Sequence, residues 1–122
     1  MTFRELLKGL VQQTPGGLVA MLVGMDGIPV DQFPQDEDLL DLSTVTVEFE
    51  RVLAETRKAV DALGGEALGS LEELIVSTTR YHLLFRAVDE EYVLVMALDP
   101  QGFLGKARYL VACLLQDIRR EL

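Results

Sequence analysis

The residues that could carry chemistry in this 122-residue chain are few and far apart. The chain has one histidine, His82, within a predicted strand, and one cysteine, Cys113, near Tyr109 on a predicted helix. Nucleophilic catalysis needs a base within reach of the nucleophile and a third group that orients the base. A zinc site needs several such ligands at short spacings. The sequence has neither pattern, so we expect His82 to be structural and Cys113 to be an inert, partly buried thiol.

Two further stretches match ligand-binding motifs only in part. In residues 64–70, GGEALGS, Ser70 stands where a phosphate-binding loop needs its lysine, and a helix rather than a strand precedes the stretch. The acids at 36–38 are consecutive and lack the alternating spacing of a calcium loop. We therefore predict no catalytic residue, no cofactor and no metal site, and we expect that the protein is not an enzyme.

The composition of the chain limits the classes of molecule that it is expected to bind. The formal charge is −9, from 20 acidic and 11 basic residues. This charge argues against binding to nucleic acid or to an anionic membrane, because both need a basic surface. It suits a basic protein partner, and it equally serves solubility. One cysteine, no long apolar run and no visible secretory signal predict a cytoplasmic protein with a single domain, residues 1–122.

Residues 71–98 are typical of three consecutive strands, and they form the centre of the predicted fold. Tyr92–Leu98 is apolar throughout, which favours a strand covered on both faces. A second apolar run, Leu18–Val23, predicts another central strand, and Asp26-Gly27 after it predicts a hairpin turn. The return strand, 28–33, contains Pro29, which donates no ladder hydrogen bond and therefore belongs at a sheet edge.

A helix is predicted at each end of the chain. Residues 2–13 repeat apolar side chains at the spacing of an amphipathic helix, with Thr2 as its N-cap and Glu5 three residues later. A helix that lies on a membrane usually has a Lys/Arg-rich polar face, which this one lacks, so we expect it to pack on the sheet. Residues 105–121 predict the last helix.

A long central helix is predicted from residue 44 to residue 63, capped by Ser43 or Thr44 and ended by two glycines. Apolar residues also lie off its main stripe, so this helix is either covered on more than one side or carries small residues that merely favour helix. The element order is then α-β-β-α-β-β-β-α. The main stripe comprises Val45, Phe49, Val52, Leu53, Thr56, Val60 and Leu63.

Two features are typical of interaction surfaces. Met25 and Ile28 flank Asp26 at the predicted hairpin tip, where large apolar residues either insert into a partner or fold back on the sheet. The strand Leu71–Ser77, if it forms the other sheet edge, has unpaired backbone groups that invite another chain.

In this order and spacing of elements, nearly the whole chain resembles the roadblock (dynein light-chain type) family, in particular bacterial MglB-like and MglC-like regulators of small GTPases. The resemblance rests on the strand, Asp26-Gly27 turn and edge strand at 18–33, the long helix at 44–63, the strands at 71–98 and Phe103–Lys106 before the last helix. It implies an α+β fold, in which a five-stranded antiparallel sheet has the long central helix on one face and the two terminal helices on the other.

The resemblance also implies a homodimer in which the long helices pack side by side and the third strands pair into one continuous sheet. An interface of this kind usually buries about 1,600 Å² or more. Met25, Asp26 and Ile28 are the predicted partner-binding residues. The implied dimer interface comprises Val45, Phe49, Val52, Leu53, Thr56, Val60, Leu71, Glu73 and Ile75.

For function, the resemblance implies a non-catalytic homodimeric adaptor in a bacterial polarity or motility switch, bound to a Ras-like GTPase or to an MglB-like roadblock regulator. A direct GTPase-activating protein for an MglA-like GTPase is the alternative. It is less favoured because the sequence ends with its last helix, whereas some MglB-like activators have a C-terminal extension. A small-ligand sensor is a third reading, and the apolar residues expected to fill the interior argue against it.

Overall fold

The computed structural model describes residues 2–34 and 42–122, without the side chains of 42–47, 49, 50 and 66. The acidic stretch at 36–38 and the side chains of Val45 and Phe49 lie outside this description. The elements follow the predicted order, with one short 3₁₀ helix in addition. They are α1 (Phe3–Gln13), β1 (Gly17–Gly24), β2 (Pro29–Phe33), α2 (Leu42–Leu63), η1 (Gly65–Ala67), β3 (Glu73–Ser77), β4 (His82–Ala87), β5 (Tyr92–Leu98) and α3 (Leu104–Glu121).

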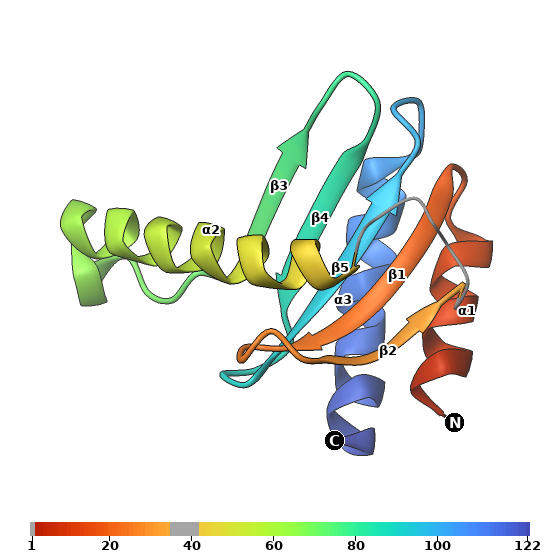
Figure 1. Ribbon diagram of the computed structural model, residues 1–122, viewed down its shortest axis with the longest axis horizontal. Coiled ribbons are helices and arrows are strands. Elements are labelled where there is room, and N and C mark those ends of the chain that lie inside the picture. The colour runs from red at the N-terminus through yellow and green to blue at the C-terminus, as the bar shows by residue number, and fades with distance from the viewer. Residues whose placement is uncertain (1, 35–41) are drawn as a thin grey trace.

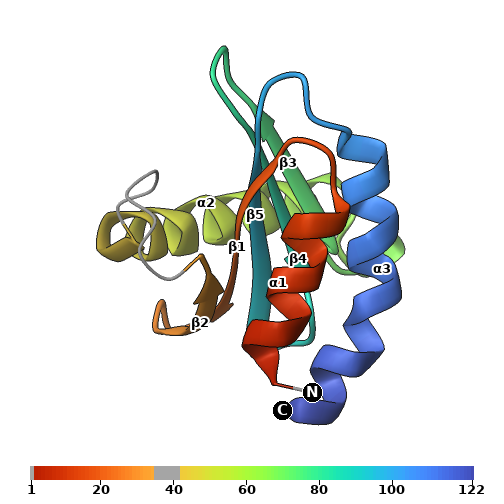
Figure 2. The same cartoon turned by 90° about the vertical axis from the view of Figure 1, so that its right-hand side faces the viewer.

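The five strands form one antiparallel sheet in the order β2-β1-β5-β4-β3. The two apolar strands β1 and β5 are therefore neighbours inside the sheet, and β2, which begins with Pro29, lies at one edge, as predicted. The other edge is β3. Helices α1 and α3 cover one face of the sheet and α2 lies across the other, which confirms the predicted α+β arrangement (Figures 1 and 2).

Alternation along β5 gives each face its own core. Leu94, Met96 and Leu98 belong to the cluster that includes the buried residues of α1 and α3, whereas Val93 and Val95 belong to the cluster under α2. This is the period of two that successive strand side chains impose. A strand buried on both faces needs apolar residues at every position, and β5 has them.

The first helix begins as the sequence predicts. The Thr2 hydroxyl oxygen accepts a hydrogen bond of 3.2 Å from the Glu5 backbone N–H, which satisfies one of the free donors of the first turn. Leu6, Leu7 and Leu10 then bury their side chains on the sheet.

Two predicted boundaries are wrong. Helix α2 begins at Leu42, so Ser43 and Thr44 lie inside its first turn and neither is the N-cap. Leu42 stands three residues before Val45 in the sequence, so helical periodicity already includes it. Strand β3 begins at Glu73 rather than Leu71, although the Glu72 carbonyl still accepts a hydrogen bond of 2.8 Å from the Ala87 N–H.

Candidate protein-interaction surfaces

From residue 51 onward, where its side chains are described, helix α2 buries little on its own sheet. It crosses the sheet face, and its C-terminal part runs out past the edge strand β3 (Figure 1). Among the described side chains of α2, Leu53 is the one that is buried, at 7% exposure, in the cluster with Phe85 and Val95. Further along, Leu63 is 79% exposed, and Val52 is 44% exposed.

Strand β3 leaves one edge of the sheet open. In the described part of the chain it pairs with β4 on one side and with no strand on the other. Leu74 and Val76 pack against the α2-side cluster but are only half-buried. Unpaired backbone groups next to uncovered apolar side chains are the features through which a sheet edge pairs with another chain. We call Val52, Leu63 and the outer edge of β3 the α2–β3 surface.

The residues predicted for a dimer interface do not all face outward. Leu53 packs into its own core, and Ile75 packs with the cluster on the α1/α3 face. Val60 lines a small hollow beside Leu71, which packs at the margin of the α2-side core. The Thr56 hydroxyl donates to the Val52 carbonyl one turn earlier, at 2.7 Å.

Glu73, at the start of β3, is engaged within its own chain. Both carboxylate oxygens accept hydrogen bonds from Arg108 of α3, from Nε at 2.8 Å and from Nη2 at 2.9 Å. These hydrogen bonds hold the pKa of Glu73 below its ordinary value, and the positive charges of Arg108 and Arg86 act in the same direction against the cost of burial. At this position the backbone, rather than the carboxylate, remains available to a partner.

Hydrogen bonds fix the conformation of the turn at the tip of the β1–β2 hairpin. Gly27 has a φ of 87°, which glycine adopts without strain, and the Asp26 carboxylate accepts a hydrogen bond of 3.0 Å from the Ile28 N–H. The Met25 N–H donates to the Glu91 carbonyl at 2.7 Å and so ties the tip to the turn between β4 and β5.

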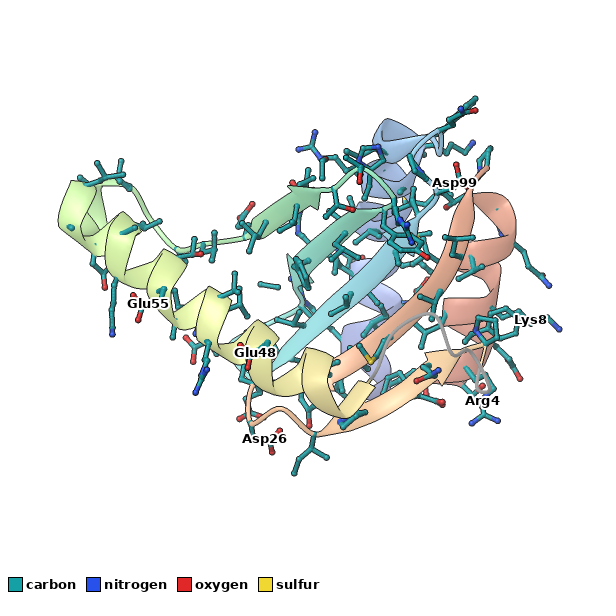
Figure 3. The ribbon with its side chains drawn as sticks, turned by 45° about the horizontal axis from the view of Figure 1, so that its top comes forward. Arg4, Lys8, Asp26, Glu48, Glu55 and Asp99 are labelled. Atoms are coloured by element: carbon teal, nitrogen blue, oxygen red, sulfur yellow. The ribbon has the colours of Figure 1, made fainter. Side chains whose placement is uncertain are left out.

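The two predicted apolar residues of this tip behave differently. Met25 folds back against the α2-side core, where its sulfur lies 3.8 Å from Arg57 Nη2. Ile28 points outward and is 63% exposed. The alternative that both residues fold back on the sheet therefore holds for Met25 and not for Ile28, and insertion of Ile28 into a partner stays a prediction. Asp26 lies at this tip, and Glu48 and Glu55 lie along α2 (Figure 3).

A hollow of about 380 Å³ lies beside the hairpin, and both acidic and apolar side chains line it. Val30 of β2 adds to the exposed aliphatic surface, and Asp26, Glu90 and Glu91 form no ion pair with any basic side chain in the described ranges 2–34 and 42–122. Val30, Glu90 and Glu91 are not among the residues predicted to bind a partner, which were Met25, Asp26 and Ile28. We call Met25, Asp26, Ile28, Val30, Glu90 and Glu91 the hairpin surface.

The histidine and the cysteine that were considered for chemistry lie in different parts of the fold. His82 Nε2 lies 2.9 Å from the Pro100 carbonyl and must donate to it, while Nδ1 lies 2.8 Å from the Ser77 hydroxyl. Cys113 is exposed rather than partly buried, because it lies on the outer side of α3 between the buried residues Val111 and Leu115. A hydrogen bond with Cys113 raises the pKa of Tyr109.

Over the described residues, no group of His, Cys, Asp and Glu is arranged to hold a metal ion. No helix in that part of the chain has the length and apolar character needed to cross a bilayer.

Comparison with known proteins identifies the family. The sequence matches no protein-family model and no curated protein. It is 36% identical to MglC from Myxococcus xanthus, whose crystal structure superimposes with a TM-score of 0.68 over 100% of both chains. The chain belongs to the roadblock/LC7 family.

Two other roadblock structures share the fold at lower identity. A roadblock/LC7 domain from Streptomyces avermitilis gives a TM-score of 0.84 at 19% identity, over 98% of this chain and 97% of that one. The gliding protein MglB from Thermus thermophilus gives 0.81 at 23% identity, over 96% of this chain and 85% of that one. These two structures show that the fold is shared at low sequence identity.

Proposed function

We propose that this roadblock protein is a non-catalytic homodimeric adaptor in a bacterial Ras-like GTPase switch that controls polarity or motility. The observation that carries the proposal is that α2 runs past the open edge of β3 with apolar side chains exposed. The 36% identity to MglC and the gliding protein among the structural neighbours support the setting.

The geometry favours a symmetric pair. If two copies join through β3, the sheet continues beneath the projecting part of each α2, so Leu63 of one copy lies over the strands of the other. Leu74 and Val76, half-buried in one chain, are then covered by the partner's helix. A two-fold axis lets the same surface serve both copies, which is the usual form of a dimer interface.

The hairpin surface is the proposed docking site for the partner protein. In this proposal it remains free in the dimer, because β2 and β3 are opposite edges of the sheet. Exposed Ile28 and Val30 beside three unpaired acids suit a segment that carries an apolar side chain flanked by Lys or Arg. An MglB-like roadblock regulator or a Ras-like GTPase would present that segment.

The test has two stages. Sedimentation equilibrium should show a dimer at micromolar concentration, and a monomer there would overturn the dimer. Pull-down against an MglB-like protein and a Ras-like GTPase should then recover at least one of them, with the rate of GTP hydrolysis unchanged. Failure to bind either would end the adaptor role, and faster single-turnover hydrolysis would establish an activator in its place.

A further inference from the structure

A second hollow, of about 570 Å³, lies where the chain enters β3, on the side of the molecule away from the β3–β4 turn. Three arginines from three different elements line it: Arg57 of α2, Arg86 of β4 and Arg119 of α3. We call this the arginine hollow. Three acids, Glu72, Asp89 and Glu90, line it as well, so the number of arginines alone does not make the hollow positive.

The three guanidinium groups have few hydrogen bonds for the number of donors they carry. Arg119 Nε donates to the Val88 carbonyl at 2.7 Å, and Arg57 Nη2 donates a long hydrogen bond to the Met25 sulfur at 3.8 Å. Arg86 Nη2 lies 3.8 Å from a Glu72 oxygen, beyond hydrogen-bond distance.

Arg86 is the most informative of the three. Its side chain is 23% exposed, and its Nε is buried with no hydrogen-bond partner among the described residues. A buried donor without a partner is costly, and one attached to a charged group more so. Nε is covered in this structure, so a ligand meets the Nη groups of Arg86 first, and Nε becomes available only when neighbouring side chains move.

Another arginine in this chain shows which group binds the Nε and Nη2 donors of a guanidinium. Arg108 uses the same two atoms, Nε and Nη2, to hold both oxygens of Glu73 at 2.8 and 2.9 Å. Two parallel hydrogen bonds of this kind are the strong form of arginine recognition, and they suit a carboxylate or a phosphate. Among the described residues, Arg86 has no carboxylate oxygen within hydrogen-bond distance of either of these two donors.

We propose that the arginine hollow binds an oxyanion, a carboxylate or a phosphate group, at the guanidinium of Arg86, through Nη2–H and, once neighbouring side chains move, through Nε–H, with Arg57 and Arg119 adding positive charge. Glu72 acts as an internal competitor. Its side chain is 77% exposed, and it reaches Arg86 only at 3.8 Å, so an incoming anion can displace it. Asp89, also at the hollow, is already occupied, because its carboxylate accepts the backbone N–H groups of Glu91 and Tyr92.

The anion can come from the acidic side chain of a partner protein or from a free phosphate compound. Both present two oxygens to Arg86, and they differ in shape and charge. This inference does not depend on the proposed dimer or on the hairpin surface, so its failure leaves both intact.

Titration of the full chain with acetate and, separately, with inorganic phosphate tests the proposal. The protein is labelled with ¹⁵N-arginine, and the Nε–H signals are followed by NMR against sodium chloride at matched ionic strength. The Arg86 signal should shift and saturate with at least one of the two anions, while that of Arg108, already paired, should stay in place. Tighter binding of acetate assigns a carboxylate partner, and tighter binding of phosphate assigns a phosphate compound.

Variants at the hollow sharpen the result. Glu72→Gln should tighten anion binding about two- to fivefold, since a weak exposed ion pair no longer competes. Arg86→Gln should weaken binding roughly ten- to hundredfold. Arg86→Lys keeps the charge without the paired donors and should fall between wild type and Arg86→Gln. An Arg86 signal that moves equally in chloride, or Glu72→Gln binding no better than wild type, would overturn the proposal.

Discussion

The two faces of the sheet differ in how completely one chain covers them. On one face α1 and α3 bury Leu7, Leu10 and Ile118 almost fully. On the other face, Leu53 is the single described side chain of α2 that is buried, and part of the helix projects beyond the sheet (Figure 1). The first face is a finished core within one chain. The second has a half-buried edge strand, β3, and exposed apolar residues on α2, as expected of an interface that a second chain completes.

The largest effect should follow from a cavity in the finished face. Leu7→Ala removes a side chain that is 1% exposed, so we expect the free energy of unfolding to fall by about 2–5 kcal/mol. Denaturant unfolding measures this loss. It should be the same at all protein concentrations if it arises within one chain, and a loss that grows on dilution would show that this face also depends on a partner.

A charge on the α2–β3 surface should act on association instead. Val52→Asp places a carboxylate where the proposed dimer buries an aliphatic side chain, so dimer affinity should fall by about 2–4 kcal/mol in sedimentation equilibrium. Ala54→Asp is the matched control, because Ala54 is exposed on the same helix, one turn from Arg51 and from Lys58. Equal loss from both variants, or from neither, would remove Val52 from the interface.

The hairpin surface should affect partner binding without affecting the fold. Ile28→Ala shortens a side chain that is 63% exposed, so unfolding should change by about 0.5 kcal/mol or less. Affinity for the partner found by pull-down should fall by about 1–2 kcal/mol in calorimetry. Tyr109→Ala, at a similarly exposed position on α3, should leave affinity unchanged. A large loss of stability in Ile28→Ala would instead make this residue part of the core.

The smallest effect concerns the link between β3 and α3. Hydrogen bonds from Arg108 lower the pKa of Glu73, so the folded chain gains stability from this carboxylate above its unfolded pKa of about 4.3. That gain is lost as the pH falls through the lower, folded value. Glu73→Gln should therefore be less stable than wild type at neutral pH, with a gap that closes in acid. Thermal unfolding across pH measures the gap, and a gap independent of pH would assign Glu73 a role other than this pairing.

Much of the fold was predictable because its signals are local. Seven apolar residues in β5, the Asp26-Gly27 turn and Pro29 at an edge each act through neighbouring residues, and the strand order confirms them. The start of α2 was mispredicted because Ser43 and Thr44 are good caps by type but lie inside the helix. The exposure of Cys113 was missed because sequence spacing alone does not show which side of α3 is covered.

The candidate surfaces were predictable only in outline. Apolar residues at the hairpin tip marked the place, yet only the fold separated Met25, which packs inward, from Ile28. Glu90 and Glu91 joined that surface through pairing of the tip with a turn more than sixty residues away in the chain.

By itself the sequence determined the type and order of the elements and the face of each strand, since these depend on periodicity, turn residues and proline. Only the tertiary structure decided what those elements leave uncovered. Gly16 packs so closely on Gly102 that a Cβ added to Gly16 would lie 2.4 Å from the Cα of Gly102. The three arginines at 57, 86 and 119 meet in one hollow for the same reason: distances between residues far apart in the chain are fixed by packing, which no local pattern records.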